Sequence, residues 1–157
     1  LVNEFSTYAR LPKANITKLN LSEICLVYIE EYKRNYDKIE INHNIEENLF
    51  VNFDHSYLDI IFNNLFKNSI EALISTNNPA IDLILKKIDK NLILTFFDNG
   101  PGYDGNIDDL IKPYFSTKNS SGLGLSLINK IITDNSYKMN ITTNSYSGFK
   151  IEIIFYD

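Results

Sequence analysis

The sequence has one cysteine, Cys25, among 157 residues, and few basic residues. A single cysteine forms no internal disulfide, which suits a reducing compartment, and its apolar neighbours Ile24 and Leu26 predict a buried side chain. The 15 Lys and Arg residues stand against 20 Asp and Glu residues, for a formal net charge of -5. Because phosphate backbones require a basic surface, this balance argues against nucleic acid as a partner.

Long apolar runs are also missing. No stretch reaches the roughly 18 residues that suggest a membrane span, and the first residues, Leu1 to Phe5, lack the basic and apolar regions of a signal peptide. The chain starts without Met and inside a periodic pattern, so we expect it to be part of a longer protein. Its 157 residues, 44% of them hydrophobic, suffice for one domain with a sizeable core.

Hydrophobic periodicity predicts both helices and strands. The predicted helices cover residues 1–10, a stretch that begins near the N-capping residue Ser22, a long segment from Asp54 or Ser56 to about Ser75, the short segment 107–112, and residues 123–134. The predicted strands begin near Ile39 and cover residues 49–53, 81–87, 92–97, 139–143 and 149–156. Pro12 ends the first helix, and residues 12–20 read as a linker. This order predicts a two-layer α/β domain, with a mixed sheet covered by helices on one face.

Two asparagines on the long predicted helix form the first candidate site. Asn64 and Asn68 are four residues apart and therefore share one face of the helix. Their amide groups suit a hard cation and phosphate, and Mg²⁺ prefers few protein oxygens together with waters and substrate phosphates. Taken alone, the pair is more simply explained as two solvent-facing residues of an Asn-rich chain.

The second candidate site is Asp98-Asn99-Gly100-Pro101-Gly102, directly after the apolar strand 92–97. A carboxylate at the end of a strand can accept a hydrogen bond from an exocyclic amine, and neighbouring glycines let the backbone approach a flat ring closely. In isolation, the same residues describe an ordinary turn.

Two more segments follow in the irregular stretch 98–122, and long irregular stretches of this kind are usually functional or disordered. Gly122-Leu123-Gly124 opens a helix, whose N-terminal amides favour an anion, although a plain helix start explains it equally. It is not a P-loop, because the Gly-Lys-Ser/Thr ending is missing. In Pro113-Tyr114-Phe115-Ser116-Thr117-Lys118, Lys118 can reach a phosphate; the alternative is an exposed lysine beside packing aromatics.

The order and spacing of these four segments resemble the N, G1, F and G2 boxes of histidine kinases, which share an ATPase superfamily with gyrase, the Hsp90 chaperones and the MutL repair proteins. The resemblance covers roughly residues 20–157. Residues 1–12 also resemble the end of the second dimerisation helix of nitrogen-regulation (NtrY-like) sensor kinases. The resemblance implies a Bergerat-type fold with a mostly antiparallel sheet. It also implies a dimerisation region ending at residue 12, a linker at 13–20, and a catalytic domain at 21–157 with a mobile lid at about 103–121.

The resemblance also implies ATP or ADP and Mg²⁺ as cofactors. Asn68 would bind magnesium, Asn64 and Lys118 would act on the phosphate side as catalytic residues, and Asp98 would recognise the adenine amine. The residues implied to bind the nucleotide are Asn64, Asn68, Asp98, Gly100, Gly102, Lys118, Gly122, Leu123 and Gly124. Three positions depart from the family pattern and bear on affinity: Glu71 replaces a frequent Lys or Arg, Ser120 a glycine, and Phe149 a threonine.

A sensor kinase would transfer the ATP γ-phosphate to a histidine upstream of Leu1, because neither His43 nor His55 is in the His-Glu or His-Asp setting expected of a phosphoacceptor. The implied partners are the dimerisation and histidine region of the same protein and a cognate response regulator. The parent is expected to be a homodimer anchored in the bacterial inner membrane, with this domain in the cytoplasm and monomeric by itself. The alternatives are a superfamily ATPase that acts as a conformational switch, an anti-sigma-type serine kinase, and a binding module without activity.

Overall fold

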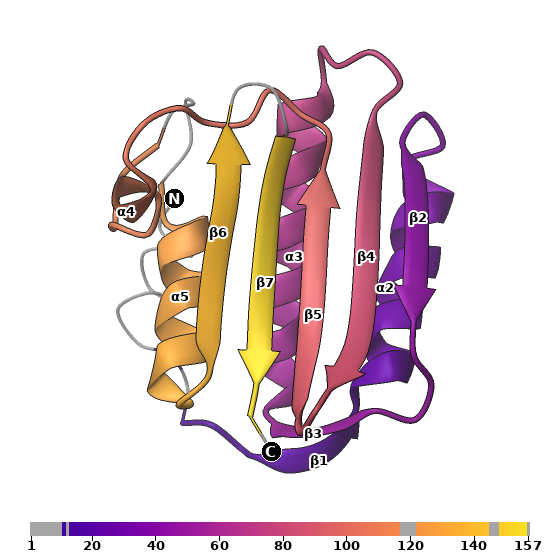
Figure 1. Ribbon diagram of the computed structural model, residues 1–157, viewed down its shortest axis with the longest axis vertical. Coiled ribbons are helices and arrows are strands. Elements are labelled where there is room, and N and C mark those ends of the chain that lie inside the picture. Colours follow the sequence, from indigo (N-terminus) through magenta and orange to yellow (C-terminus); the bar gives the residue numbers. More distant parts are fainter. Residues whose placement is uncertain (1–10, 12, 117–121, 145–147, 157) are drawn as a thin grey trace.

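The chain folds into a sheet with helices on one face, as the ribbon of the computed structural model shows (Figure 1). The structure describes residues 11, 13–116, 122–144 and 148–156. The five-stranded sheet has the order β2-β4-β5-β7-β6. The strands are β2 (Glu40–Ile45), β4 (Ala80–Ile88), β5 (Asn91–Asp98), β6 (Lys138–Asn144) and β7 (Gly148–Phe155). Strands β2 and β4 are parallel and the other pairs antiparallel, so the predicted mixed, mostly antiparallel sheet is confirmed.

In the described part of the chain, three helices cover the sheet: α2 (Leu21–Asn35), α3 (His55–Leu73) and α5 (Gly124–Asp134). The core lies between the two layers, because alternate residues of each central strand point toward the helices. In β5, Leu92, Leu94 and Phe96 are buried, whereas the residues between them are half-buried on the open face. Helix α3 supplies Leu58 and Ile61, both 0% exposed. The two-layer prediction is therefore confirmed.

The segment before α2 and the start of that helix differ from the sequence prediction. Residues 17–20, expected to be irregular, form β1 (Thr17–Asn20), which pairs antiparallel with β3 (Phe50–Phe53) in a separate small sheet. Asn20 rather than Ser22 caps α2, and its side chain accepts the Glu23 N–H at 3.3 Å. Ser22 is buried and bridges the chain instead, donating to the Glu46 carbonyl at 2.6 Å and accepting from the Leu49 N–H at 3.0 Å.

The other element boundaries lie close to the predicted ones. Asp54 caps α3 by accepting the Ser56 N–H at 2.7 Å, and the helix ends at Leu73, before the predicted Ser75. The predicted helix at 107–112 is shorter, as α4 (Ile107–Leu110). The helix predicted over 1–10 lies outside the described residues. None of the described helices has the length and apolar character needed to cross a membrane.

Cys25 is 0% exposed, as predicted, and its burial raises the pKa of the thiol to about 12. A thiol with such a pKa stays protonated at neutral pH, so Cys25 acts as a small apolar core residue.

Candidate functional site

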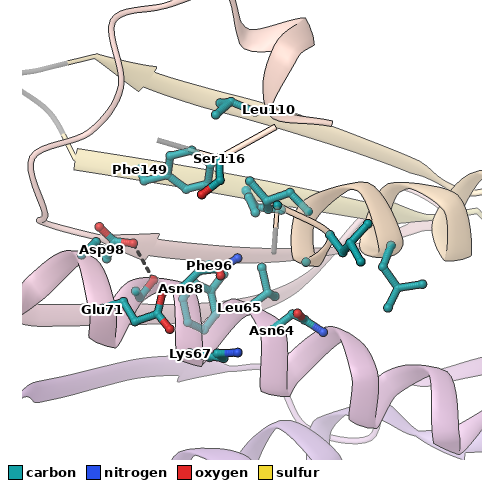
Figure 2. A pocket seen from close by; sticks show the side chains of 18 of the residues that line it. Asn64, Leu65, Lys67, Asn68, Glu71, Phe96, Asp98, Leu110, Ser116 and Phe149 are labelled. Atoms are coloured by element: carbon teal, nitrogen blue, oxygen red, sulfur yellow. Dashed lines mark hydrogen bonds between the residues drawn. The ribbon is translucent and has the colours of Figure 1, made fainter. Parts of the chain in front are cut away.

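A cavity of about 690 Å³ lies between α3, the start of α5 and the end of β5 (Figure 2). This volume is in the usual range for small-molecule sites. Most of the residues singled out in the sequence meet there, although they come from distant parts of the chain. The predicted site residues that line the cavity are Asn64, Asn68, Asp98, Gly102, Gly122, Leu123 and Gly124. Gly100 is not among the lining residues, and Lys118 lies outside the described part of the chain.

Helix α3 forms one wall of the cavity with two adjacent rows of side chains. Within each row the residues are four apart, as the helical repeat requires for one face. The first row is Ile60, Asn64, Asn68 and Ala72. The second row is Asp59, Asn63, Lys67 and Glu71. The apolar residues of α3 point the other way into the core, so the burial of one face fixes which polar side chains the opposite face presents.

Two tyrosines of α2 hold the start of the second row. The Tyr28 hydroxyl donates to Asp59 Oδ1 at 2.5 Å, and the Tyr32 hydroxyl donates to Asn63 Oδ1 at 3.1 Å. Burial, the hydrogen bond to Asp59 and the charge of Asp59 raise the pKa of Tyr28, so its hydroxyl remains a donor at neutral pH. The Tyr28 ring stacks on the buried Phe62 with centroids 4.6 Å apart, so the residue that binds Asp59 is itself packed against the core.

Asp98 forms the deep end of the cavity. Its side chain is buried, with the residue 2% exposed. Asp98 Oδ2 accepts from the Ser69 hydroxyl at 2.5 Å, and Oδ1 accepts from the Gly100 N–H at 3.0 Å. A Cβ at Gly100 would lie 2.8 Å from Asp98 Oδ1 and 3.3 Å from the Ala72 Cβ. The Gly100 N–H therefore helps to orient the Asp98 carboxylate, and a side chain at Gly100 would displace that carboxylate.

The N-terminus of α5 forms the opposite end. Among the described residues, no side-chain hydrogen bond caps this helix at Leu123, and its first residues, Gly124 and Leu125, line the cavity. A Cβ at Gly124 would lie 2.8 Å from Asn64 Oδ1 and 3.5 Å from Asn68 Nδ2. Glycine is therefore what allows the helix start to approach both asparagines. Gly122 has φ of 66°, a left-handed conformation that glycine adopts without strain.

Residues 103–116 form the remaining side of the cavity. The Tyr103 N–H donates to Thr143 Oγ1 at 2.9 Å, and the Tyr114 N–H donates to the Gly122 carbonyl at 3.0 Å. The Tyr103 and Phe115 rings meet edge to face at 6.1 Å, and both residues line the cavity. Within this described part of the expected lid, Tyr103, Leu110, Phe115 and Ser116 line the cavity, and α4 is its one regular element.

The cavity has lining residues that the sequence analysis did not single out. Asp59, Asn63 and Lys67 are one position before Ile60, Asn64 and Asn68, so the same four-residue spacing was available as a signal. Tyr103 carries no such signal, because a contact between Tyr103 and Phe115 is not visible in a local pattern. Phe149, expected to remove a polar group from the site, lines the cavity as an apolar residue.

The two ends of the cavity differ in chemistry. The deep end offers the buried carboxylate of Asp98, which accepts hydrogen bonds, and the apolar lining residues Phe96 and Phe149. The other end offers amide side chains and a helix N-terminus, which favour anions. The set fits a ligand with a flat, amine-bearing ring at one end and phosphates at the other. The described residues contain no group of three or more His, Cys, Asp or Glu side chains able to hold a metal. A Mg²⁺ ion here would therefore take its ligands from Asn68, water and the phosphates.

Comparison with known proteins agrees with this geometry. A family model described as "Histidine kinase-, DNA gyrase B-, and HSP90-like ATPase" matches residues 53–156. The nitrogen regulation protein NtrY of Azorhizobium caulinodans is 24% identical over 85% of this chain. A putative NtrY-like sensor histidine kinase of Rickettsia bellii is 26% identical over 99% of the chain. The chain spans only 18% and 26% of the lengths of these two relatives.

Solved structures share the fold. The catalytic domain of histidine kinase ThkA, in a nucleotide-free form, superposes with a TM-score of 0.79 at 24% identity, covering 90% of this chain and 97% of that domain. ThkA in complex with the response regulator TrrA gives a TM-score of 0.82 at 23% identity, covering 99% of this chain and 46% of that one. At this level of identity the likeness establishes the two-layer fold.

Proposed function

Because this chain belongs to the family of histidine kinase-, DNA gyrase B- and HSP90-like ATPases, we propose that it is the ATP-binding catalytic domain of a sensor histidine kinase. It transfers the γ-phosphate of ATP to a histidine that precedes Leu1 in the parent protein, and a response regulator then receives the phosphate. The observation that carries the proposal is the meeting of four ordered sequence segments at one cavity with a carboxylate end and an anion-binding end. The NtrY-type relatives support the kinase over the other members of the family.

The proposed roles follow the two ends of the cavity. Asp98 accepts a hydrogen bond from the adenine amine, with Gly100 and Gly102 shaping that end. Asn68 binds Mg²⁺, and Asn64 and Lys118 contact the phosphates together with the backbone of Gly122, Leu123 and Gly124. Phosphoryl transfer depends mainly on positioning and on neutralising charge. The protein's task at this site is therefore to hold the triphosphate so that its terminal phosphate meets the incoming histidine.

The proposed setting follows from the kinase assignment. Residues 1–12 are the end of a dimerisation region, residues 13–20 lead into the catalytic domain, and residues 103–121 form its lid. The parent is a homodimer anchored at the bacterial inner membrane, with this domain on the cytoplasmic side, where ATP is supplied. This chain alone is a monomer.

The test is to incubate the parent protein with γ-labelled ATP and Mg²⁺. We expect label on a histidine, recognised because it survives base and is lost in acid, and no label on this chain alone. Asn68→Ala should abolish the label, and Asn42→Ala, at an exposed position of β2, should leave it unchanged. Release of inorganic phosphate without any labelled histidine would identify a switch-type ATPase. Acid-stable label on the serine of another protein would identify a serine kinase. Either result would contradict the proposal.

A further inference from the structure

Glu71 places a carboxylate beside the expected path of the phosphates. The family resembled by the sequence frequently has Lys or Arg at this position. Glu71 lines the cavity and is half-buried. Figure 2 shows it on α3 between Asp98, at the deep end, and Lys67. Among the described lining residues Lys67 is the one cation, whereas Asp59, Glu71 and Asp98 are acidic. A further negative charge near phosphates is unfavourable, about 1 kcal/mol at 4 Å in bulk water and more in a protein cleft. The position of Glu71 therefore calls for a compensating contact with the ligand.

The other acidic residues of the cavity wall already have protein partners. Asp98 accepts from Ser69 and Gly100, and Asp59 accepts from Tyr28. Glu71 belongs to the same row as Asp59 but lies 12 residues further along α3, about 18 Å at 1.5 Å per residue. Glu71 thus lies nearer than Asp59 to the Asp98 end of the cavity, and it follows Asn68 by three residues.

The part of a nucleotide that passes Glu71 is the pentose. A base seated against the buried Asp98 lies deep, next to Ser69 and Ala72. Phosphates bound at Asn68 and Gly124 lie toward the start of α3. The sugar must connect the two, and Glu71 is in the neighbouring row of α3, three residues after Asn68. A carboxylate accepts hydrogen bonds from ribose hydroxyls well, which is how acidic residues recognise the ribose of dinucleotides in other folds.

We infer that Glu71 selects ribonucleotides, its carboxylate accepting a hydrogen bond from the ribose 2′-hydroxyl of the bound nucleotide. The inference rests on the proposed function, since it requires an adenine nucleotide in this cavity. The contact explains why an acidic side chain is compatible with this site. The ribose hydroxyl donates to the Glu71 carboxylate, which would otherwise face the phosphates without a partner from the ligand.

The experiment is calorimetric titration of the chain with ADP and with 2′-deoxy-ADP, both with Mg²⁺. The unmutated chain should bind ADP about tenfold more tightly, the effect of one hydrogen bond to a charged group. Glu71→Ala should weaken ADP binding about tenfold and leave 2′-deoxy-ADP within about twofold, so that the preference disappears. Glu71→Gln, which keeps an acceptor but loses the charge, should retain part of the preference.

The matched control is Glu30→Ala, which removes an exposed helical glutamate of α2 away from the cavity. It should leave both affinities unchanged. Equal affinities of the unmutated chain for the two nucleotides would overturn this inference, as would a preference that survives in Glu71→Ala. Equal weakening of both nucleotides by Glu71→Ala would also overturn it, because the contact would then be to the base or the metal. Failure to bind ADP at all would overturn the proposed function, and the ribose contact with it.

Discussion

The two walls of the cavity are built in different ways. The α3 wall stands on a buried aromatic layer: Phe66 is 0% exposed, stacks on Tyr32 with centroids 4.0 Å apart, and meets Phe96 edge to face at 4.9 Å. The wall formed by residues 103–116 has one short helix, and Tyr114 in it is 61% exposed. Packed regular elements hold side chains in place, whereas weakly buried segments open at low cost in free energy. The difference suits a site in which α3 positions the ligand and the other wall admits it.

The largest expected effect compares one phenylalanine from each wall. Phe66→Ala should lower the free energy of unfolding by about 3–5 kcal/mol, because it removes a fully buried ring and leaves a cavity. Phe115→Ala, at a half-buried position, should cost about 1 kcal/mol, because less surface is lost from the core. Urea unfolding of the two variants measures both values. Equal losses would mean that residues 103–116 are as firmly packed as α3.

The next effect concerns binding at the deep end. Asp98→Asn should weaken ADP binding about 10-fold to 100-fold, the range for hydrogen bonds to charged groups. The amide presents a donor where Ser69, Gly100 and the adenine amine all supply hydrogens. Calorimetry gives the affinity, and Asp82→Asn on β4, outside the cavity, is the matched control. Unchanged affinity in Asp98→Asn would show that the adenine base does not bind at this end of the cavity.

A smaller effect should appear as a pH dependence of stability at the start of α3. Burial tends to raise the pKa of Asp54, but hydrogen bonds from the Ser56 side chain and from the N–H groups of Asn15, Ser56 and Tyr57 together lower that pKa below its ordinary value of 3.8. A lowered pKa stabilises the fold above the ordinary value, and this contribution is lost as the pH falls through the folded-state pKa. Asp54→Ala should cost about 1 kcal/mol at pH 7.

The measurement is urea unfolding of both proteins from pH 7 down to pH 3. The difference between the unmutated chain and Asp54→Ala should shrink as the pH falls below about 4. A difference that is constant over this range would show that the cap acts without its charge.

The sequence predicted the helices and strands better than it predicted which strands pair. The alternation in 92–97 and the periodicity of 54–75 are local signals, and both predicted elements are present. The parallel pairing of β2 with β4 is set by packing over long separations, which no local pattern expresses. The strand Thr17–Asn20 was missed because four mostly polar residues show no alternation, and their pairing with β3 is what makes them a strand.

For the site, residue types with unusual chemistry in ordered motifs were enough to find both ends of the cavity. The motifs did not reveal the second row of α3, to which Asp59 and Asn63 belong. Asp59 and Asn63 depend on Tyr28 and Tyr32, which are 31 residues away in the sequence in each case. Such contacts become visible only when α2 and α3 are packed together, so the α3 wall could be predicted in outline and its support could not.

Hydrogen exchange with and without Mg²⁺ and ADP tests the central claim, that a nucleotide binds between these two walls. At about 100 times the dissociation constant, a ligand stabilises the bound form by about 2.7 kcal/mol. Exchange should slow markedly in residues 103–116 and in the first turn of α5. It should change little in the middle of α3, which is already protected by its hydrogen bonds and buried face. Protection that is unchanged at both walls, or that increases only on the open face of the sheet, would contradict the account.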